Sequence, residues 1–239
     1  MIRRLLRIAP FLILILLLIF FACATRDGAA VSNPSAQVLF IGNSYTYLNG
    51  GLDVMLSQID PSISTERIAG AGYRLQDHWN DRHALDRIRT KKWTHVVLQE
   101  QSQLPVVSAA EYMEFAGKFS SEIRLKGAEV ILLMTWERPD SISYGVTTEN
   151  MANRINEAGR ALKVKVAPAG LAFARSLEQK PDLTLYTTDG HPTIHGSYLA
   201  ACVLYKVITG KSPVQSIYSP PGISDKDRNF LQQIASQTN

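Results

Sequence analysis

The stretch Gln-Val-Leu-Phe-Ile-Gly-Asn-Ser-Tyr-Thr, residues 37–46, decides the fold that we predict. Residues 37–41 form a short, mostly apolar run that ends at Gly42, which is typical of a strand buried in a parallel sheet. Ser44 follows at the turn out of this strand. Because parallel α/β sheets bind ligands at the carboxyl ends of their strands, the residues just after the strand are candidate site residues.

Four more apolar runs alternate with helical patterns along the chain. We expect further strands at 64–68, 95–99, 129–135 and 164–167, and helices at 52–59, 75–89, 108–127, 151–162, 198–208 and from 224 onward. Strands that alternate with helices predict a parallel sheet with helices on both faces. We therefore expect a three-layer α/β/α sandwich with a mostly parallel five-stranded sheet. Ser108 and Glu111 have the spacing of a capping box, and Ser224 is expected to cap the last helix.

The composition suits one globular domain. The chain has 239 residues, of which 46% are hydrophobic and 19% are charged. Its net charge of +4 falls to +1 once the basic residues among the first 22, Arg3, Arg4 and Arg7, are set aside, which gives no reason to expect nucleic-acid binding. The two cysteines, Cys23 and Cys202, offer no disulfide framework.

Residues 1–23 have the layout of a secretory leader, with a basic start, an apolar run and a return to polar residues. Ala22-Cys23-Ala24 fits a lipoprotein site with Cys23 as the lipidated residue, and it also fits an Ala-x-Ala cleavage site. A third alternative is an uncut anchor, since about 17 apolar residues are at the lower limit for spanning a membrane. All three put the chain outside the cytoplasm. We expect a lipid-anchored protein on the periplasmic side of a bacterial membrane, with 24–36 as a flexible tether and 37–239 as the domain.

Two segments far apart in the sequence carry residues suited to nucleophilic catalysis. Ser44 is expected near a helix N-terminus, where backbone N–H groups favour a developing negative charge. Asp189 and His191 lie before an apolar helix and have the types of a base and its orienting acid. A helix-capping serine and a solvated Asp-Gly turn are the structural alternatives. A metal site on Asp189, His191 and His195 is disfavoured, because it leaves Ser44 unexplained.

These motifs resemble the sequence blocks of the SGNH/GDSL hydrolases. Residues 38–46 resemble the first block, in which a strand ends in Gly-x-Ser and the serine is the nucleophile. His191-Pro192-Thr193 followed by Gly196 resembles the last block, and residues 69–72 are similar to the second, whose glycine lends a backbone N–H to the oxyanion hole. The resemblance implies a flavodoxin-like fold and an acyl-enzyme on Ser44, with His191 as base. It also implies oxyanion contacts from Ser44 and Gly72, with no metal or organic cofactor.

The chain departs from the family pattern at two places. The asparagine of the third block is absent, since the third predicted strand runs into Gln-Glu-Gln-Ser-Gln at residues 99–103. We assign the oxyanion amide to Gln101, with Gln99 and Gln103 as alternatives, because glutamine carries the same amide donor. The aspartate stands two residues before the histidine rather than three. Asp189 is therefore expected to support His191, with a Ser-His dyad as the alternative.

The sequence thus predicts a serine hydrolase that acts on carboxylic esters. The expected envelope location, and a likeness of residues 99–103 to some carbohydrate acetylesterases, favour O-acetyl groups on glycans as substrates. The alternatives are an envelope O-acyltransferase that uses the same residues and a non-catalytic lipoprotein that binds glycan in the same pocket.

Several other polar or aromatic residues are expected to be structural. Asp77, His78, Asp81 and His83 share one predicted helix and are expected on its solvated face rather than around a metal. His195 is expected at a helix start. Trp136, after the fourth predicted strand, either lines the pocket or packs in the core.

Overall fold

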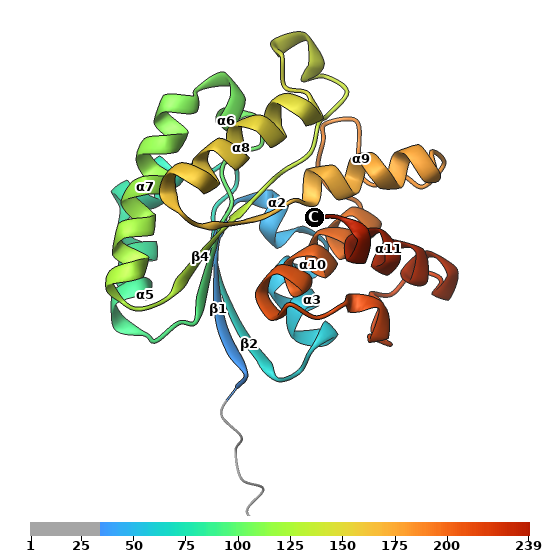
Figure 1. Cartoon of the computed structure of the whole chain (residues 1–239), viewed down its shortest axis with the longest axis horizontal. Helices are drawn as coiled ribbons and strands as arrows, with labels where there is room; N and C mark the ends of the chain where they lie inside the picture. Colours follow the sequence, from blue (N-terminus) through green and yellow to red (C-terminus); the bar gives the residue numbers. More distant parts are fainter. Residues whose placement is uncertain (1–33) are drawn as a thin grey trace, which may run out of the picture. The chain divides into compact units, whose positions relative to one another are not determined.

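Five strands pair in parallel in one sheet. The computed structural model describes residues 34–239. Its strands are β1 (Ala36–Gly42), β2 (Ile63–Ala69), β3 (His95–Leu98), β4 (Glu129–Leu133) and β5 (Lys165–Ala167), in the order β2-β1-β3-β4-β5. This is the strand order of flavodoxin-like doubly wound sheets. The predicted α/β/α fold is confirmed (Figure 1). The leader and most of the tether, residues 1–33, lie outside the described residues.

Helices cover both faces of the sheet (Figure 1). One layer contains α3 (Leu52–Ile59), α9 (Ala169–Gln179), α10 (Ile194–Thr209) and α11 (Asp225–Gln237). The other contains α4 (Leu75–Asp81), α5 (His83–Thr90), α7 (Ala109–Leu125) and α8 (Thr148–Leu162). The remaining helical elements are short. They are the helices α2 (Ser44–Tyr47) and α6 (Leu104–Val107) and the 3-10 turns η1 (Leu48–Gly50), η2 (Ile142–Tyr144) and η3 (Pro213–Gln215).

Alternate residues of β1 serve the two layers. Val38 and Phe40 belong to the core cluster under α3 and α10, whereas Leu39 and Ile41 belong to the cluster under α5 and α7, and all four are fully buried. A strand buried on both faces needs apolar residues throughout rather than an alternation. The apolar run before Gly42 therefore correctly predicted β1, an inner strand of the sheet. Its carboxyl end is where Ser44 emerges.

Two local expectations about the helices are wrong, and one helix was not expected. The predicted helix 75–89 is two helices, because Arg82 adopts a left-handed conformation (φ 66°) that separates α4 from α5. The capping box at Ser108 does not form: its hydroxyl contacts Glu111 at 3.5 Å and accepts no N–H of the helix, because α6 ends directly before it. Helix α9 was not expected. Ser224 does cap α11, accepting the N–H of Asp227 at 3.1 Å.

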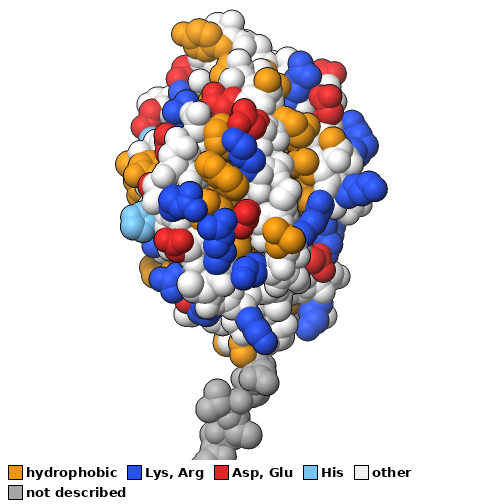
Figure 2. Space-filling model, turned by 90° about the vertical axis from the view of Figure 1, so that its left-hand side faces the viewer, with side chains coloured by type: hydrophobic (Ala, Val, Ile, Leu, Met, Phe, Trp, Pro, Cys, Tyr) orange, Lys and Arg blue, Asp and Glu red, His pale blue; other side chains and the backbone are white. Residues whose placement is uncertain are grey.

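The face formed by α5 and α7 carries many Lys and Arg side chains, with Asp, Glu and hydrophobic side chains between them (Figure 2). Some are paired, as in Arg89–Glu122 at 2.8 Å. Mixed charges of this kind keep a helix face solvated. Across residues 34–239, no helix combines the length and the hydropathy needed to cross a membrane.

Candidate active site

Ser44 is the first residue of α2 and follows β1 after a single intervening residue, Asn43. Asn43 shapes the turn. Its Oδ1 accepts the N–H of Tyr45 at 3.1 Å, and its Nδ2 donates to the carbonyl of Tyr73 at 2.9 Å. The serine is 9% exposed, and its backbone N–H has no acceptor among the described residues. The predicted nucleophile is therefore largely buried, and its backbone N–H is not used by any described acceptor.

Ser44, His191 and Asp189 form a continuous hydrogen-bonded chain. Ser44 Oγ lies 2.9 Å from His191 Nε2, and His191 Nδ1 lies 2.8 Å from Asp189 Oδ2. An ionised carboxylate only accepts hydrogen bonds, so Nδ1 carries the ring proton in this arrangement. Nε2 is then the acceptor for the serine hydroxyl. This is the geometry of a nucleophile, a base and an orienting acid.

A tight turn explains how an aspartate two residues before the histidine reaches its ring. Gly190 N–H donates to the carbonyl of Thr187 at 2.8 Å, and Gly190 has φ 82°. Asp189 Oδ1 accepts the backbone N–H of His191 at 3.2 Å, while Oδ2 takes the ring. The carboxylate thus folds back over its own turn, as aspartates in turns commonly do.

The charge of Asp189 is well supported although the side chain is largely exposed. The Thr187 hydroxyl, then the ring and backbone N–H of His191, lower the pKa of Asp189 below its ordinary value. Asp189 therefore stays ionised across the range in which an imidazole acts as a base.

The glutamines after β3 occupy different environments. Gln99 is buried: its Oε1 accepts the N–H of Asn43 and the hydroxyl of Thr46, each at 2.9 Å, and its Nε2 donates to the carbonyl of Glu100. Gln101 is half-buried, and its Oε1 accepts the N–H of Gln103 and Leu104 at 2.9 and 3.1 Å. Its Nε2 has no acceptor among the described residues. The amide of Gln99 is thus fully used in holding the nucleophile turn. The amide of Gln101 is held in place through its oxygen, and its NH2 group remains available to donate.

Gly72 lies in the turn that follows β2. Tyr73 N–H closes this turn on the carbonyl of Gly70 at 3.1 Å, and Gly70 N–H donates to the carbonyl of Gly42 at 3.3 Å. Gly72 has φ 69°, which favours glycine, and its own N–H has no acceptor among the described residues. Because Asn43 binds the Tyr73 carbonyl, this turn is fixed against the nucleophile turn.

A stack of aromatic rings packs against the His191 side chain. The rings of Tyr45 and Trp136 stack with centroids 4.7 Å apart, those of Trp136 and Phe173 stack at 4.0 Å, and Tyr45 meets the His191 ring edge-on at 5.5 Å. Trp136 is 2% exposed and donates from Nε1 to the carbonyl of Gly190 at 3.0 Å. Of the two interpretations of Trp136, packing is the one observed, and it holds the loop that carries His191.

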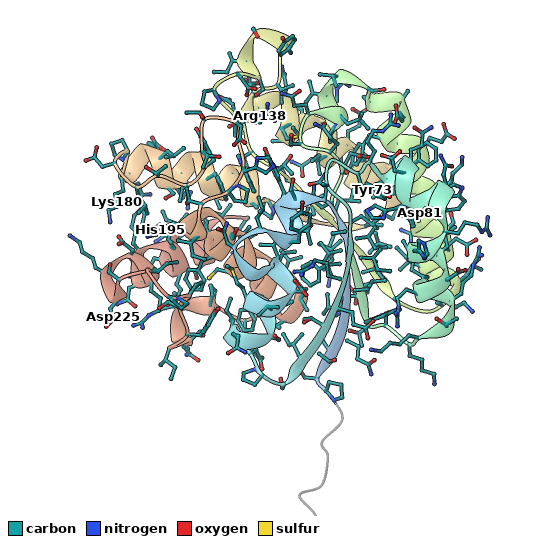
Figure 3. All side chains as sticks on the ribbon, turned by 180° about the vertical axis from the view of Figure 1, so that it is seen from behind. Tyr73, Asp81, Arg138, Lys180, His195 and Asp225 are labelled. Carbon is teal, nitrogen blue, oxygen red and sulfur yellow. The ribbon has the colours of Figure 1, made fainter. Side chains whose placement is uncertain are left out.

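Arg138 was not singled out by its sequence context. It lies on the loop after β4, towards the top of Figure 3. Its guanidinium pairs with Asp140 and lies 3.5 Å from Ser102 Oγ, and its side chain packs where a Cβ on Gly190 would be. It therefore borders the segments that carry Gln101 and His191. No local pattern marks such a residue, because the contacts come from distant elements.

The remaining candidates take no part in the hydrogen-bonded chain of Ser44, His191 and Asp189. His78 was expected on a solvated face, but it is 1% exposed and its Nε2 donates to the carbonyl of Gly42 at 2.8 Å, and burial lowers its pKa. His195 is the second residue of α10 and lies beside Lys180 in Figure 3, with Asp227 3.9 Å from its Nε2. Within residues 34–239, no three His, Cys, Asp or Glu side chains converge as metal ligands.

Solved structures resemble this fold, whereas no protein-family model and no curated protein sequence matches the chain. A protein of Slackia heliotrinireducens assigned to the SGNH hydrolases is 26% identical, with a TM-score of 0.64 over 72% of this chain and 98% of its own. A DUF4886 family protein of Bacteroides uniformis is 18% identical, with a TM-score of 0.68 over 84% and 93%. An acetylxylan esterase of Geobacillus stearothermophilus is 15% identical, with a TM-score of 0.56 over 74% and 95%.

The order of the site segments is the one expected from the sequence blocks that resemble those of the SGNH/GDSL hydrolases. A serine follows the first strand, an amide side chain follows the third, and an aspartate and a histidine precede a C-terminal helix. By its fold, this arrangement and its likeness to the Slackia protein, the chain belongs to the SGNH/GDSL hydrolase superfamily.

Proposed function

We propose that this protein is a serine hydrolase that cleaves carboxylic esters through an acyl-enzyme on Ser44. The observation that carries the proposal is the unbroken chain of hydrogen bonds from Asp189 through His191 to Ser44. A serine hydroxyl is a weak nucleophile unless an adjacent base removes its proton. His191 is in contact with it and is itself oriented by a carboxylate.

The proposed reaction has two half-steps. His191 Nε2 takes the hydroxyl proton as Ser44 Oγ attacks the ester carbonyl, and the carbonyl oxygen becomes an oxyanion. The N–H groups of Ser44 and Gly72 and the Gln101 amide donate to that oxyanion. His191 then gives its proton to the departing alcohol, which leaves the acyl group on Ser44. In the second half-step His191 deprotonates a water that attacks the acyl carbonyl. The bond between the acyl carbon and Ser44 Oγ then breaks, His191 returns its proton to Ser44 Oγ, and the free acid leaves.

O-acetyl groups on glycans are the substrates that we propose. The acetylxylan esterase among the similar structures acts on an ester of this type, and residues 99–103 resemble the corresponding segment of carbohydrate acetylesterases. The leader, which lies outside the described residues, would place the enzyme at the cell envelope, where such glycans are found. We include in the proposal that the protein is exported and lipid-anchored at Cys23.

The test is Ser44→Ala, with Ser57→Ala, a change at a half-buried serine of α3, as its control. We expect Ser44→Ala to lose hydrolysis of p-nitrophenyl acetate and labelling by a fluorophosphonate probe, while its melting temperature stays close to that of the wild type. Retention of more than a tenth of the wild-type rate would exclude Ser44 as nucleophile. A wild-type protein that the probe does not label would favour the non-catalytic glycan-binding alternative. Transfer to an added sugar alcohol in preference to water would favour the acyltransferase.

A further inference from the structure

Glu100 is a buried carboxyl group between two segments of the proposed oxyanion hole. It is 3% exposed and lies directly before Gln101. Its Oε1 accepts two backbone N–H groups, that of Leu75 at 3.1 Å and that of Gln101 at 2.7 Å. Its Oε2 is buried and has no hydrogen-bond partner among residues 34–239.

A buried carboxyl group in this position lowers the free energy of unfolding. The pKa of Glu100 is raised to about 7, because burial, together with the nearby Glu111, outweighs the two N–H donors and Arg74, which lower it. Tyr112, which is also buried, is the other titratable group facing it. A leucine of similar volume would avoid both the desolvation and the unpartnered oxygen. The carboxyl group supplies one thing that leucine cannot, an acceptor shared by two backbone segments.

The two segments are those that carry proposed oxyanion donors. Leu75 is the first residue of α4 and is separated by one residue, Arg74, from the turn that holds Gly72. Gln101 carries the proposed amide donor. One oxygen of Glu100 therefore sets the distance between the end of the Gly72 turn and the backbone of Gln101. The preceding residue, Gln99, binds the nucleophile turn in the same way.

We propose that Glu100 is a positioning residue that holds the Gly72 turn and Gln101 in register, so that both donors meet the oxyanion. This inference rests on the proposed function. Donors to an oxyanion act only when they are placed to within about 0.5 Å, and a displacement of about 1 Å can cost on the order of 100-fold in rate. Since the donors act on charge that develops in the transition state, their loss lowers kcat more than it changes KM.

The experiment compares Glu100→Leu, which removes the shared acceptor, with Glu100→Gln, which retains Oε1. Glu111→Gln is the matched control, because Glu111 belongs to the same charged cluster through Arg74 at 3.1 Å but does not bond the two segments. We expect Glu100→Leu to lower kcat for p-nitrophenyl acetate by about 10- to 100-fold, with KM within about threefold. Glu100→Gln should restore most of kcat, and Glu111→Gln should leave it unchanged.

Two further measurements separate positioning from a general loss of stability. In a Gln101→Ala background the added effect of Glu100→Leu on kcat should be smaller than in the wild type, because the Gln101 donor is already absent and only the placement of the Gly72 N–H remains to be lost. Amide hydrogen exchange at Leu75 and Gln101 should become faster in Glu100→Leu than in Glu111→Gln, while exchange in β1 and β4 is unchanged.

The inference is overturned if Glu100→Leu keeps wild-type kcat, or if it lowers kcat equally with and without Gln101. It is also overturned if the Leu75 and Gln101 amides remain as protected as in the wild type. The exchange measurement does not need an active enzyme. A wild-type protein without esterase activity would therefore contradict the proposed function, whereas unchanged protection would contradict the role of Glu100.

Discussion

At the scale of single residues, Asp189 uses both carboxylate oxygens on His191, one on the backbone and one on the ring. If this contact orients the base, Asp189→Asn should lower kcat by a large factor, on the order of 10³ or more, because the imidazole loses its preferred tautomer and the stabilisation of its charged form. KM should move little, since neither group need bind the substrate in its ground state. Steady-state kinetics on p-nitrophenyl acetate measures both quantities.

His195→Ala is the matched control for this change. His195 follows His191 closely in sequence but contacts Asp227 rather than Ser44, so we expect less than a threefold effect on kcat. If Asp189→Asn keeps most of the activity while His191→Ala is inactive, the protein works as a Ser-His dyad. An inactive His195→Ala variant with an active His191→Ala variant would show that the base is assigned to the wrong histidine.

The sequence allowed prediction of these residues but not of those that hold them. Ser44 and His191 stand in short motifs beside a strand end and a helix start, and local patterns of that kind are readable. The hydrogen bonds of Gln99 to Asn43 and of Trp136 to Gly190 join residues more than 50 positions apart. Such contacts depend on how the elements pack, which no local pattern encodes.

At the scale of secondary-structure elements, the turn before α10 depends on Gly190. Its φ is 82°, and a Cβ there would lie 2.3 Å from Cδ of Arg138 and 2.8 Å from the hydroxyl of Tyr45. We therefore expect Gly190→Ala to displace His191 from Ser44. Its kcat should fall by at least about tenfold, because small shifts of a catalytic group are costly. Its melting temperature, measured in parallel, should also fall.

Gly222→Ala separates the backbone strain from the steric clash. Gly222 also has a positive φ, 92°, but a Cβ there would meet nothing within 4 Å. It should show only the conformational cost of an alanine in a left-handed region, about 1 kcal/mol, with kcat unchanged. Equal loss of kcat in both variants would mean that the packing around Gly190 is not what places His191.

The strands were easier to predict than the helix boundaries. A strand buried on both faces is an apolar run, and the predicted bounds differ from the observed ones by at most two residues. The break at Arg82 has no glycine or proline to signal it. It exists because α5 must turn to bury Ala84, Leu85 and Ile88, so tertiary packing overrides a continuous helical pattern.

At the scale of the whole molecule, the proposed envelope location depends on residues outside those described by the structure. If Cys23 is the lipidated residue, cells that express the full chain should incorporate labelled palmitate into it, and Cys23→Ser should lose the label. Cys202→Ser is the control, since Cys202 is buried in α10 and should not affect labelling. An unlabelled protein whose N-terminus is Thr25 would instead establish cleavage at the Ala-x-Ala site.

The direction of the sheet determines how the molecule can be attached to a surface. All five strands are parallel, so β1 carries the chain from Ala36, at the amino end of the strands, to the turn before Ser44, at their carboxyl end. The entry is fixed where Ser35 N–H donates to the carbonyl of Ser62 at 2.8 Å. A protein immobilised on a bead through the residues before Pro34 would be held at the amino end of the strands, opposite the end where Ser44 lies. Bulky polymeric substrates could then reach the serine from the open solution without passing between the protein and its support.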